Sequence, residues 1–250
     1  MSSSIWTRCE GRSRVRLLEG AAWRVVESQH LFSTRKLVDS DAEQQLLEDL
    51  IEEKKPPADA PRLHFLLFTP FRYPPLPHGS RFGTRAERGI WYGSIEQRTA
   101  FAELAYYRLL FLEGTSAELA PLMLEVSAFC ASYRTRRGVD LTRPPFDEHE
   151  GEISSPRRYA ASQRLGLEMR EGGVQAFHYR SARDAEGGTN VGLFTPEAFA
   201  SPRPSVPETW HCVVSPKEVE LVKKDVFRRV AHRFPRRQFE VEGRLPAPAF

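Results

Sequence analysis

Cysteine is scarce in this sequence of 250 residues, which contains only Cys9, Cys130 and Cys212. These cysteines are far apart and form no Cys-x-x-Cys pair, so the sequence predicts neither a disulfide framework nor a zinc knuckle. Long hydrophobic runs are also missing. No segment approaches the length of a membrane span, and residues 1–16 contain no apolar run of the signal-peptide kind. These absences favour a cytosolic protein with free thiols.

Several motifs of binding and catalysis are absent as well. The sequence has no GxGxxG for a Rossmann dinucleotide site and no GxxxxGK[ST] for a P-loop. It also lacks GxSxG and HExxH, and its seven histidines are scattered without the spacing of a metal site. We therefore expect no metal. His178 alternates with apolar neighbours, a pattern more typical of a hydrogen-bonded sheet residue than of a ligand.

The charges nearly balance, because 36 Lys and Arg face 33 Asp and Glu to give a net charge of +3. Positive residues concentrate in two places, residues 134–137 and residues 223–237. Such runs are usually solvated surface, and no zinc finger, RNP or GxxG signature accompanies them. We expect no direct binding of nucleic acid.

The first 61 residues are predicted to form a helical extension. Ser40 and Glu43 make a capping box that begins an amphipathic helix, which ends before Pro56. Residues 21–29 are predicted as a second helical segment. One such helix and a short partner have too little apolar area to fold alone, so we expect the extension to pack on a larger core. The residues expected to be buried there are Leu46, Leu47, Leu50 and Ile51.

Strand-like and helical patterns are interleaved in residues 62–215, which predicts an α+β main domain, followed by a basic strand and tail over residues 216–250. The predicted strands are 63–68, 89–93, 122–128, 174–179, 191–194, 210–214 and 218–222, the last two forming a hairpin. The predicted helices are 94–112, with a capping box at Ser94 and Gln97, and 159–170, which ends at a Gly-Gly pair. Residues 138–156 are rich in Pro, Gly and acidic residues and are predicted as a long surface loop that could cover a site.

Four short segments stand out in their order along the chain. They are Gly79-Ser80-Arg81-Phe82-Gly83, Ile90-Trp91-Tyr92, Thr99-Ala100-Phe101-Ala102-Glu103 and Tyr179-Arg180-Ser181-Ala182-Arg183-Asp184. This order resembles the RES family, which is named for an Arg, a Glu and a Ser. Residues 187–196, a glycine turn leading into Phe-x-Pro, are similar to the family's closing segment. The resemblance covers residues 71–199.

The resemblance implies an α+β fold with an ADP-ribosyltransferase-like mixed sheet, and NAD as the substrate. It also implies a toxin of a toxin–antitoxin pair, neutralised by an Xre-like helix-turn-helix antitoxin. Its expected catalytic residues are Glu103, Arg81 and Ser181, and its expected NAD-binding residues are Arg81, Tyr92, Ser181 and Asn190. The family turn often reads Gly-Gly-Arg-Trp, whereas Ser80 and Phe82 flank the arginine here. Arg72 is therefore an alternative to Arg81.

The residue types suit this chemistry. A guanidinium such as that of Arg81 offers a planar fork of donors to phosphate oxygens. A fixed carboxylate such as Glu103 stabilises the positive charge that develops on the ribose as nicotinamide leaves. The ring of Tyr92 can stack on nicotinamide, and the hydroxyl of Ser181 can hydrogen-bond the ribose or orient the carboxylate. Purely structural roles remain open for these residues. Tyr92 could serve only to pack the strand, Glu103 could form an ion pair, and Ser181 could cap a turn through Asp184.

Three functions are compatible with these patterns. The first is cleavage of the nicotinamide–ribose bond of NAD with water or phosphate as acceptor. The second is transfer of ADP-ribose to a protein, and the third is a catalytically silent module that binds a nucleic acid or a protein partner. The sequence does not choose the acceptor, because each acceptor attacks the same oxocarbenium-like centre.

Overall fold

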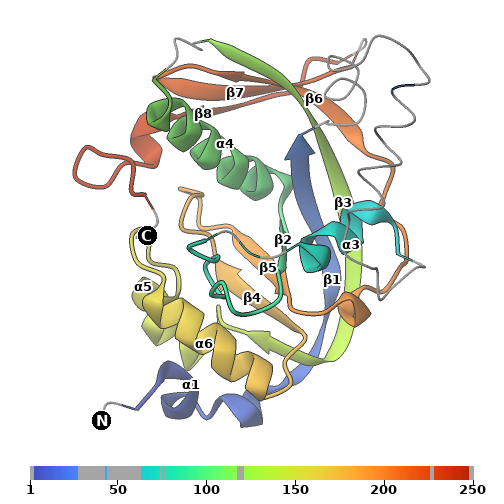
Figure 1. Ribbon diagram of the computed structural model, residues 1–250, viewed down its shortest axis with the longest axis vertical. Coiled ribbons are helices and arrows are strands. Elements are labelled where there is room, and N and C mark those ends of the chain that lie inside the picture. The colour runs from blue at the N-terminus through green and yellow to red at the C-terminus, as the bar shows by residue number, and fades with distance from the viewer. Residues whose placement is uncertain are drawn as a thin grey trace.

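The computed structural model describes residues 3–27, 43, 63–73, 75, 77–116, 121–225 and 228–247. They form a mixed eight-stranded sheet with helices packed against it (Figure 1), so the predicted α+β class is confirmed. No helix in the described part of the chain is long and apolar enough to span a membrane.

The strands are β1 (Arg16–Glu27), β2 (Trp91–Ser94), β3 (Leu122–Asp140), β4 (Ala176–Arg180), β5 (Thr189–Leu193), β6 (Glu208–Val214), β7 (Glu218–Lys223) and β8 (Ala231–Pro235). The α-helices are α1 (Ile5–Arg8), α3 (Phe65–Arg72), α4 (Gln97–Gly114), α5 (Glu150–Ile153) and α6 (Ala160–Glu171). The 3-10 helices are η1 (Gly11–Arg14), η2 (Phe146–His149), η3 (Pro196–Ala198) and η4 (Arg236–Gln238).

The sheet is organised around β3, which is 19 residues long. The strand order is β1-β2-β5-β4-β3-β6-β7-β8, and β1 also pairs with β3. Following the pairs from β1 through β2, β5, β4 and β3 therefore leads back to β1. The β3–β4 pair is parallel and the other pairs are antiparallel. Strands β6, β7 and β8 extend the sheet beyond this ring.

The N-terminal segment differs from its prediction. Residues 21–29 were expected to be helical, but Arg16–Glu27 is strand β1, so the helical prediction is wrong. Adjacent residues of this strand pack in different parts of the core. Ala22 lies in one hydrophobic cluster with Phe129, whereas Trp23 packs against another cluster, which contains the buried residues of α4. Burial on both faces hides the alternating pattern of a half-buried strand. The predicted helix that begins at Ser40 lies outside the described residues, as do the four apolar residues expected to be buried there.

Three further elements differ from prediction. The predicted strand 63–68 lies largely in α3, where the His64 side chain accepts a hydrogen bond from the Leu66 amide at 3.3 Å and caps the helix. Ser94 belongs to β2, and Glu96 is the N-cap of α4, so the expected capping box is wrong. The predicted loop 138–156 contains the end of β3, η2 and α5. It is ordered because Phe146 and Ile153 are buried in the core.

The other predicted elements are confirmed with shifted ends. They are β2, the beginning of β3, the helix α6, the strands β4 and β5, and the hairpin of β6 and β7. In the hairpin turn, the Ser215 hydroxyl accepts from the Glu218 amide at 3.1 Å. His178 is a hydrogen-bonded sheet residue, as predicted, because its Nε2 lies 2.7 Å from the Tyr133 hydroxyl.

The helix α4 is the element that positions the candidate site. Figure 1 shows it beside β7 and β8, while α5 and α6 lie at the other end of the molecule. One face of α4 is buried against the extended part of the sheet, where Phe101 packs edge-to-face on Trp210 with ring centroids 4.6 Å apart. The opposite face of the helix is left to line a cavity.

Candidate functional site

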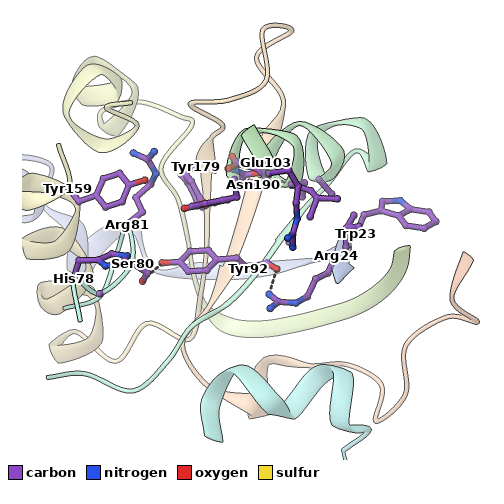
Figure 2. Close-up of a pocket in the computed structure, with 18 residues that line it drawn as sticks. Trp23, Arg24, His78, Ser80, Arg81, Tyr92, Glu103, Tyr159, Tyr179 and Asn190 are labelled. Carbon is purple, nitrogen blue, oxygen red and sulfur yellow. Dashed lines mark hydrogen bonds between the residues drawn. The ribbon is translucent and has the colours of Figure 1, made fainter. Parts of the chain in front are cut away.

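A cavity of about 400 Å³ lies between α4, strands β1, β2, β4 and β5, and the turn before β2 (Figure 2). Its lining is rich in aromatic rings and arginines and contains one carboxylate. The lining residues are Trp23, Arg24, Val25, His78, Gly79, Ser80, Arg81, Tyr92, Gly93, Ser94, Ala100, Glu103, Leu104, Tyr107, Arg108, Tyr159, Tyr179 and Asn190.

One wall of the cavity is a single face of α4. The helix contributes five residues, Ala100, Glu103, Leu104, Tyr107 and Arg108. Residues three and four apart share one face of an α-helix, so this spacing forms a continuous stripe. Since the buried face of α4 fixes the rotation of the helix, it also fixes the direction of Glu103.

The facing wall is one row of the sheet. Ser94 pairs with Asn190 between β2 and β5, and Asn190 pairs with Tyr179 between β5 and β4. Residues directly opposite each other in antiparallel strands project to the same face. All three therefore point to the cavity side, and the register of the strands sets which face they occupy.

Glu103 is held through only one of its two carboxylate oxygens. Its Oε1 accepts a hydrogen bond from Ser181 Oγ at 2.7 Å and another from Asn190 Nδ2 at 2.6 Å. Ser94 Oγ donates to Asn190 Oδ1 at 2.6 Å, which orients the Asn190 amide. No hydrogen bond among the described residues uses Oε2. The site thus contains a carboxylate with a fixed orientation and one oxygen still available to a ligand.

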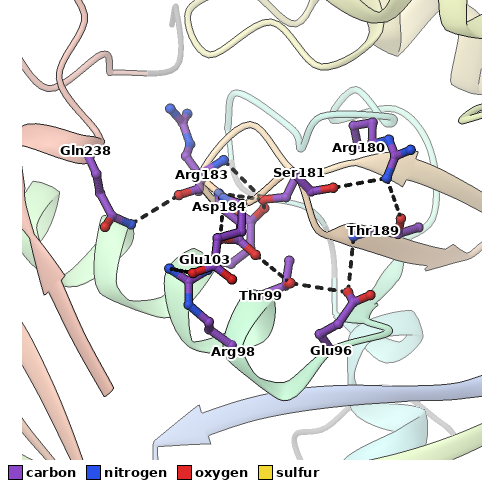
Figure 3. Close-up of polar contacts among 12 residues, drawn as sticks. Glu96, Arg98, Thr99, Glu103, Arg180, Ser181, Arg183, Asp184, Thr189 and Gln238 are labelled. Carbon is purple, nitrogen blue, oxygen red and sulfur yellow. Dashed lines mark hydrogen bonds and ion pairs between the residues drawn. The ribbon is translucent and has the colours of Figure 1, made fainter. Parts of the chain in front are cut away.

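Ser181 is not among the residues that line the cavity, but it contacts Glu103, which does. Figure 3 shows its polar contacts. Its hydroxyl donates to Glu103 and accepts from the backbone amides of Arg183 and Asp184 at 3.1 and 3.0 Å. Asp184 in turn is ion-paired with Arg98 and accepts from Thr99 Oγ1 at 2.7 Å. Ser181 therefore caps a turn and orients the carboxylate at the same time.

Arg81 is a buried residue of the cavity lining and lies in a tight turn. Gly79 has φ +73°, a left-handed conformation that glycine adopts without strain. The Ser80 amide donates a hydrogen bond to the Gly83 carbonyl at 2.7 Å, which closes the turn. The Arg81 Nη1 donates to the Ser155 carbonyl at 2.7 Å, and its guanidinium lies 4.6 Å from the centroid of the Tyr159 ring. The alternative arginine, Arg72, is at the end of α3 and does not line the cavity.

Tyr92 presents its ring to the cavity while its hydroxyl is engaged elsewhere. The hydroxyl accepts from the Phe82 amide at 3.2 Å and lies 2.9 Å from Ser80 Oγ. Burial raises the pKa of Tyr92 to about 12, so the phenol is protonated at neutral pH. The rings of Tyr92 and Tyr179 meet edge-to-face with centroids 6.3 Å apart, which makes an aromatic wall.

The structure thus brings Arg81, Tyr92, Glu103 and Asn190 to one cavity and places Ser181 in contact with Glu103. Their roles toward a ligand remain predictions. Sequence reasoning missed other lining residues. Tyr179 stood in the segment that carries the resemblance, but no pattern distinguished it, and Tyr159 gave no signal beyond its place before α6.

The described residues contain no group of three or more side chains suited to hold a metal ion. The site combines a fixed carboxylate with aromatic rings and guanidinium groups. Such a lining suits a planar, charged organic ligand. The RES domain matches residues 56–215, more than half of the chain, and the chain belongs to the RES domain family. The family is associated with toxins of toxin–antitoxin systems and with NAD. A search of curated proteins finds no match to this chain.

Proposed function

We propose that this protein cleaves the nicotinamide–ribose bond of NAD and acts as the toxin of a toxin–antitoxin pair. The observation that carries the proposal is the carboxylate of Glu103, which is oriented by Ser181 and Asn190 at 2.7 and 2.6 Å and keeps its second oxygen available in the cavity. As nicotinamide leaves, the ribose acquires positive charge, and a carboxylate oriented beforehand stabilises that charge more than it stabilises the substrate.

The other residues of the cavity support binding and orientation. The rings of Tyr92 and Tyr179, which meet edge-to-face, offer an apolar wall to the flat nicotinamide. Arg81 offers a guanidinium for a phosphate group and is held in place by the Ser155 carbonyl and the Tyr159 ring. Ser181 and Asn190 are positioning residues, because their hydrogen bonds reach Glu103.

Incubation of purified, partner-free protein with NAD, followed by chromatography of nicotinamide, tests the proposal directly. We expect nicotinamide to accumulate with time and enzyme concentration. Free ADP-ribose as co-product would identify water as the acceptor, and a phosphorylated ADP-ribose would identify phosphate. Labelled ADP-ribose on a protein band would instead support a protein-directed transferase. If no nicotinamide is released, the protein is a silent binding module and the proposal is wrong.

Arg81→Ala is expected to raise the dissociation constant for NAD about tenfold, because it removes a charged hydrogen-bond donor from a phosphate group that is present in substrate and transition state alike. The rate at saturating NAD should change much less. Isothermal titration with ADP-ribose and steady-state kinetics check both expectations. Arg72→Ala is the matched control, since Arg72 does not line the cavity. If Arg72→Ala weakens binding and Arg81→Ala does not, the assignment of the two arginines is reversed.

A further inference from the structure

The chain after β8 crosses the molecule from α4 to the segment before α6. We call residues 236–247 the C-terminal strap, and they lie beyond the end of the RES domain match. Figure 1 shows this part of the chain running from the side of α4 and β8 toward α5. A β-bridge between Val241 and Arg244 closes a turn in the strap, and Glu242 in this turn pairs with Arg157 at 2.8 Å. The turn of the strap is thus in contact with the segment before α6.

Two buried apolar side chains fasten the strap to α4. Phe239 and Leu245 belong to the hydrophobic cluster that contains the buried face of α4. The Phe239 ring lies beside the ring of Tyr106 on α4, with centroids 6.1 Å apart. The Tyr106 hydroxyl donates a hydrogen bond to the Pro246 carbonyl. Tyr106 therefore contacts the strap near its beginning and near its end.

The strap also reaches the turn that carries Ser181. Gln238 Nε2 donates to the Arg183 carbonyl at 3.5 Å, as Figure 3 shows. The Arg183 guanidinium lies 3.5 Å from the centroid of the Tyr106 ring, and its Nη2 donates to the Pro156 carbonyl at 3.0 Å. Arg183 is buried and forms no ion pair within the described ranges. Its position therefore depends on Tyr106, on the strap and on a backbone carbonyl.

This turn determines how the Ser181 hydroxyl meets Glu103. The Arg183 amide donates to Ser181 Oγ at 3.1 Å, and the same hydroxyl donates to Glu103 Oε1 at 2.7 Å. A hydroxyl has a single proton, so amide donors at its oxygen direct that proton to the carboxylate. We propose that the C-terminal strap is a positioning element of the candidate site, which holds the Arg183 turn and through it the orientation of Glu103. The inference rests on the proposed function for its kinetic consequences, but not for its effect on the turn.

Hydrogen exchange at the Arg183 and Asp184 amides tests the effect on the turn without any substrate. Both amides donate to Ser181 Oγ, so their exchange requires the turn to open. Tyr106→Phe keeps the ring that supports Arg183 and removes the hydroxyl that binds the strap. We expect both amides to exchange about three- to tenfold faster, because the closed state loses one hydrogen bond. Exchange at the native rate overturns the inference.

Tyr133→Phe is the matched control for this substitution. It also removes one buried tyrosine hydroxyl, which lies 2.7 Å from His178 Nε2, but Tyr133 is on β3 and does not line the cavity. The two amides should exchange within about twofold of the native rate in this variant, because the hydroxyl that it removes does not bind the strap. Equal acceleration in both variants would show a general loss of stability and would overturn the inference.

Phe239→Ala, which removes an apolar anchor of the strap, tests the kinetic consequence. We expect nicotinamide release at saturating NAD to slow about ten- to hundredfold, because a small displacement of a reacting group is costly even when its cause is remote. The dissociation constant for ADP-ribose should change less than about threefold, since the groups that bind phosphate remain. Phe239→Leu retains an apolar anchor and should recover most of the rate. Should Phe239→Ala fail to fold, the exchange rates of Tyr106→Phe decide the inference.

A double-mutant cycle separates positioning from a general loss of stability. If the strap acts on Glu103 through Ser181, Phe239→Ala should slow a Ser181→Ala protein less than about threefold, although it slows the native protein about tenfold or more. An equal fold-change in both backgrounds would mean that the strap acts independently of Ser181, and the inference would be wrong.

The outcomes also distinguish this inference from the proposed function. Native protein that releases no nicotinamide loses the enzymatic proposal, and hydrogen exchange alone then decides the role of the strap. Native protein that releases nicotinamide, and whose Phe239→Ala variant folds and releases it at the native rate, retains the enzymatic proposal and loses the strap as a positioning element.

Discussion

Glu103→Gln is expected to slow nicotinamide release about a hundred- to thousandfold while ADP-ribose binds with nearly native affinity. The glutamine oxygen can occupy the place of Oε1 and accept the same hydrogen bonds from Ser181 and Asn190. The local structure should therefore persist. What the variant loses is the negative charge beside the ribose, which matters mainly when positive charge develops in the transition state. Single-turnover rates and ADP-ribose titrations measure the two effects separately.

The same helix supplies a matched control for this substitution. Glu113 lies near the end of α4, outside the cavity lining, and is paired with Arg236 at 3.1 Å on the surface. Glu113→Gln should leave the rate within about twofold of the native value, because an exposed ion pair contributes little. A native rate in Glu103→Gln would show that the carboxylate is structural. The proposed mechanism would then be wrong, although the family assignment would stand.

Local patterns were sufficient for the parts of the site that lie close together in sequence. The amphipathic segment that carries Glu103 and the strand that carries Tyr92 were both predicted, because each owes its structure to its own residues and near neighbours. The glycine pair at 187 and 188 was predicted as a turn. The structure gives the reason, since Gly187 has φ +72° and a Cβ on Gly188 would lie 2.0 Å from Thr99 Oγ1.

Long-range pairing decided what local patterns could not. Residues 21–27 contain branched, aromatic and charged residues that are compatible with either a helix or a strand. They form a strand because β3 pairs along them, as with Trp23 and Cys130. A pairing between residues far apart in the chain produces no recognisable pattern in a short window of sequence. Arg24, another residue of the cavity lining, was missed for the same reason, since a strand pairing brings it to the Tyr92 carbonyl.

The C-terminal part of β3 also could not be predicted from local patterns. Its first residues, 122–128, were predicted as a strand, yet it continues to Asp140 through a stretch of arginines. Those arginines alternate with buried residues such as Tyr133 and Thr135, so the strand is half exposed there. The charge of the stretch concealed this alternation. The basic cluster at residues 134–137 is thus part of a strand, with Arg134 paired to Glu19 across β1.

The turn that carries Arg81 is packed against α6 through a glycine. A Cβ placed on Gly166 would lie 2.0 Å from the Phe82 carbonyl oxygen and 2.8 Å from its carbon. The obstacle is backbone, which cannot rotate away as a flexible side chain can. Gln163 of the same helix donates to the Ser80 carbonyl at 3.0 Å. The helix α6 therefore sets the position of the turn, and through it the position of Arg81.

Gly166→Ala is accordingly expected to destabilise the protein by about 1–3 kcal/mol, even though alanine favours a helix interior by about 1 kcal/mol. The midpoint of thermal unfolding should fall by roughly 2–12 °C. Affinity for ADP-ribose should fall as well, since relief of the clash moves the turn of Arg81. Gly151→Ala is the control: Gly151 also lies in a helix, but its Cβ would meet nothing within 4 Å, so stability should hold or rise slightly. Calorimetric scans that show equal midpoints for Gly166→Ala and Gly151→Ala would refute the proposed coupling between α6 and the arginine turn.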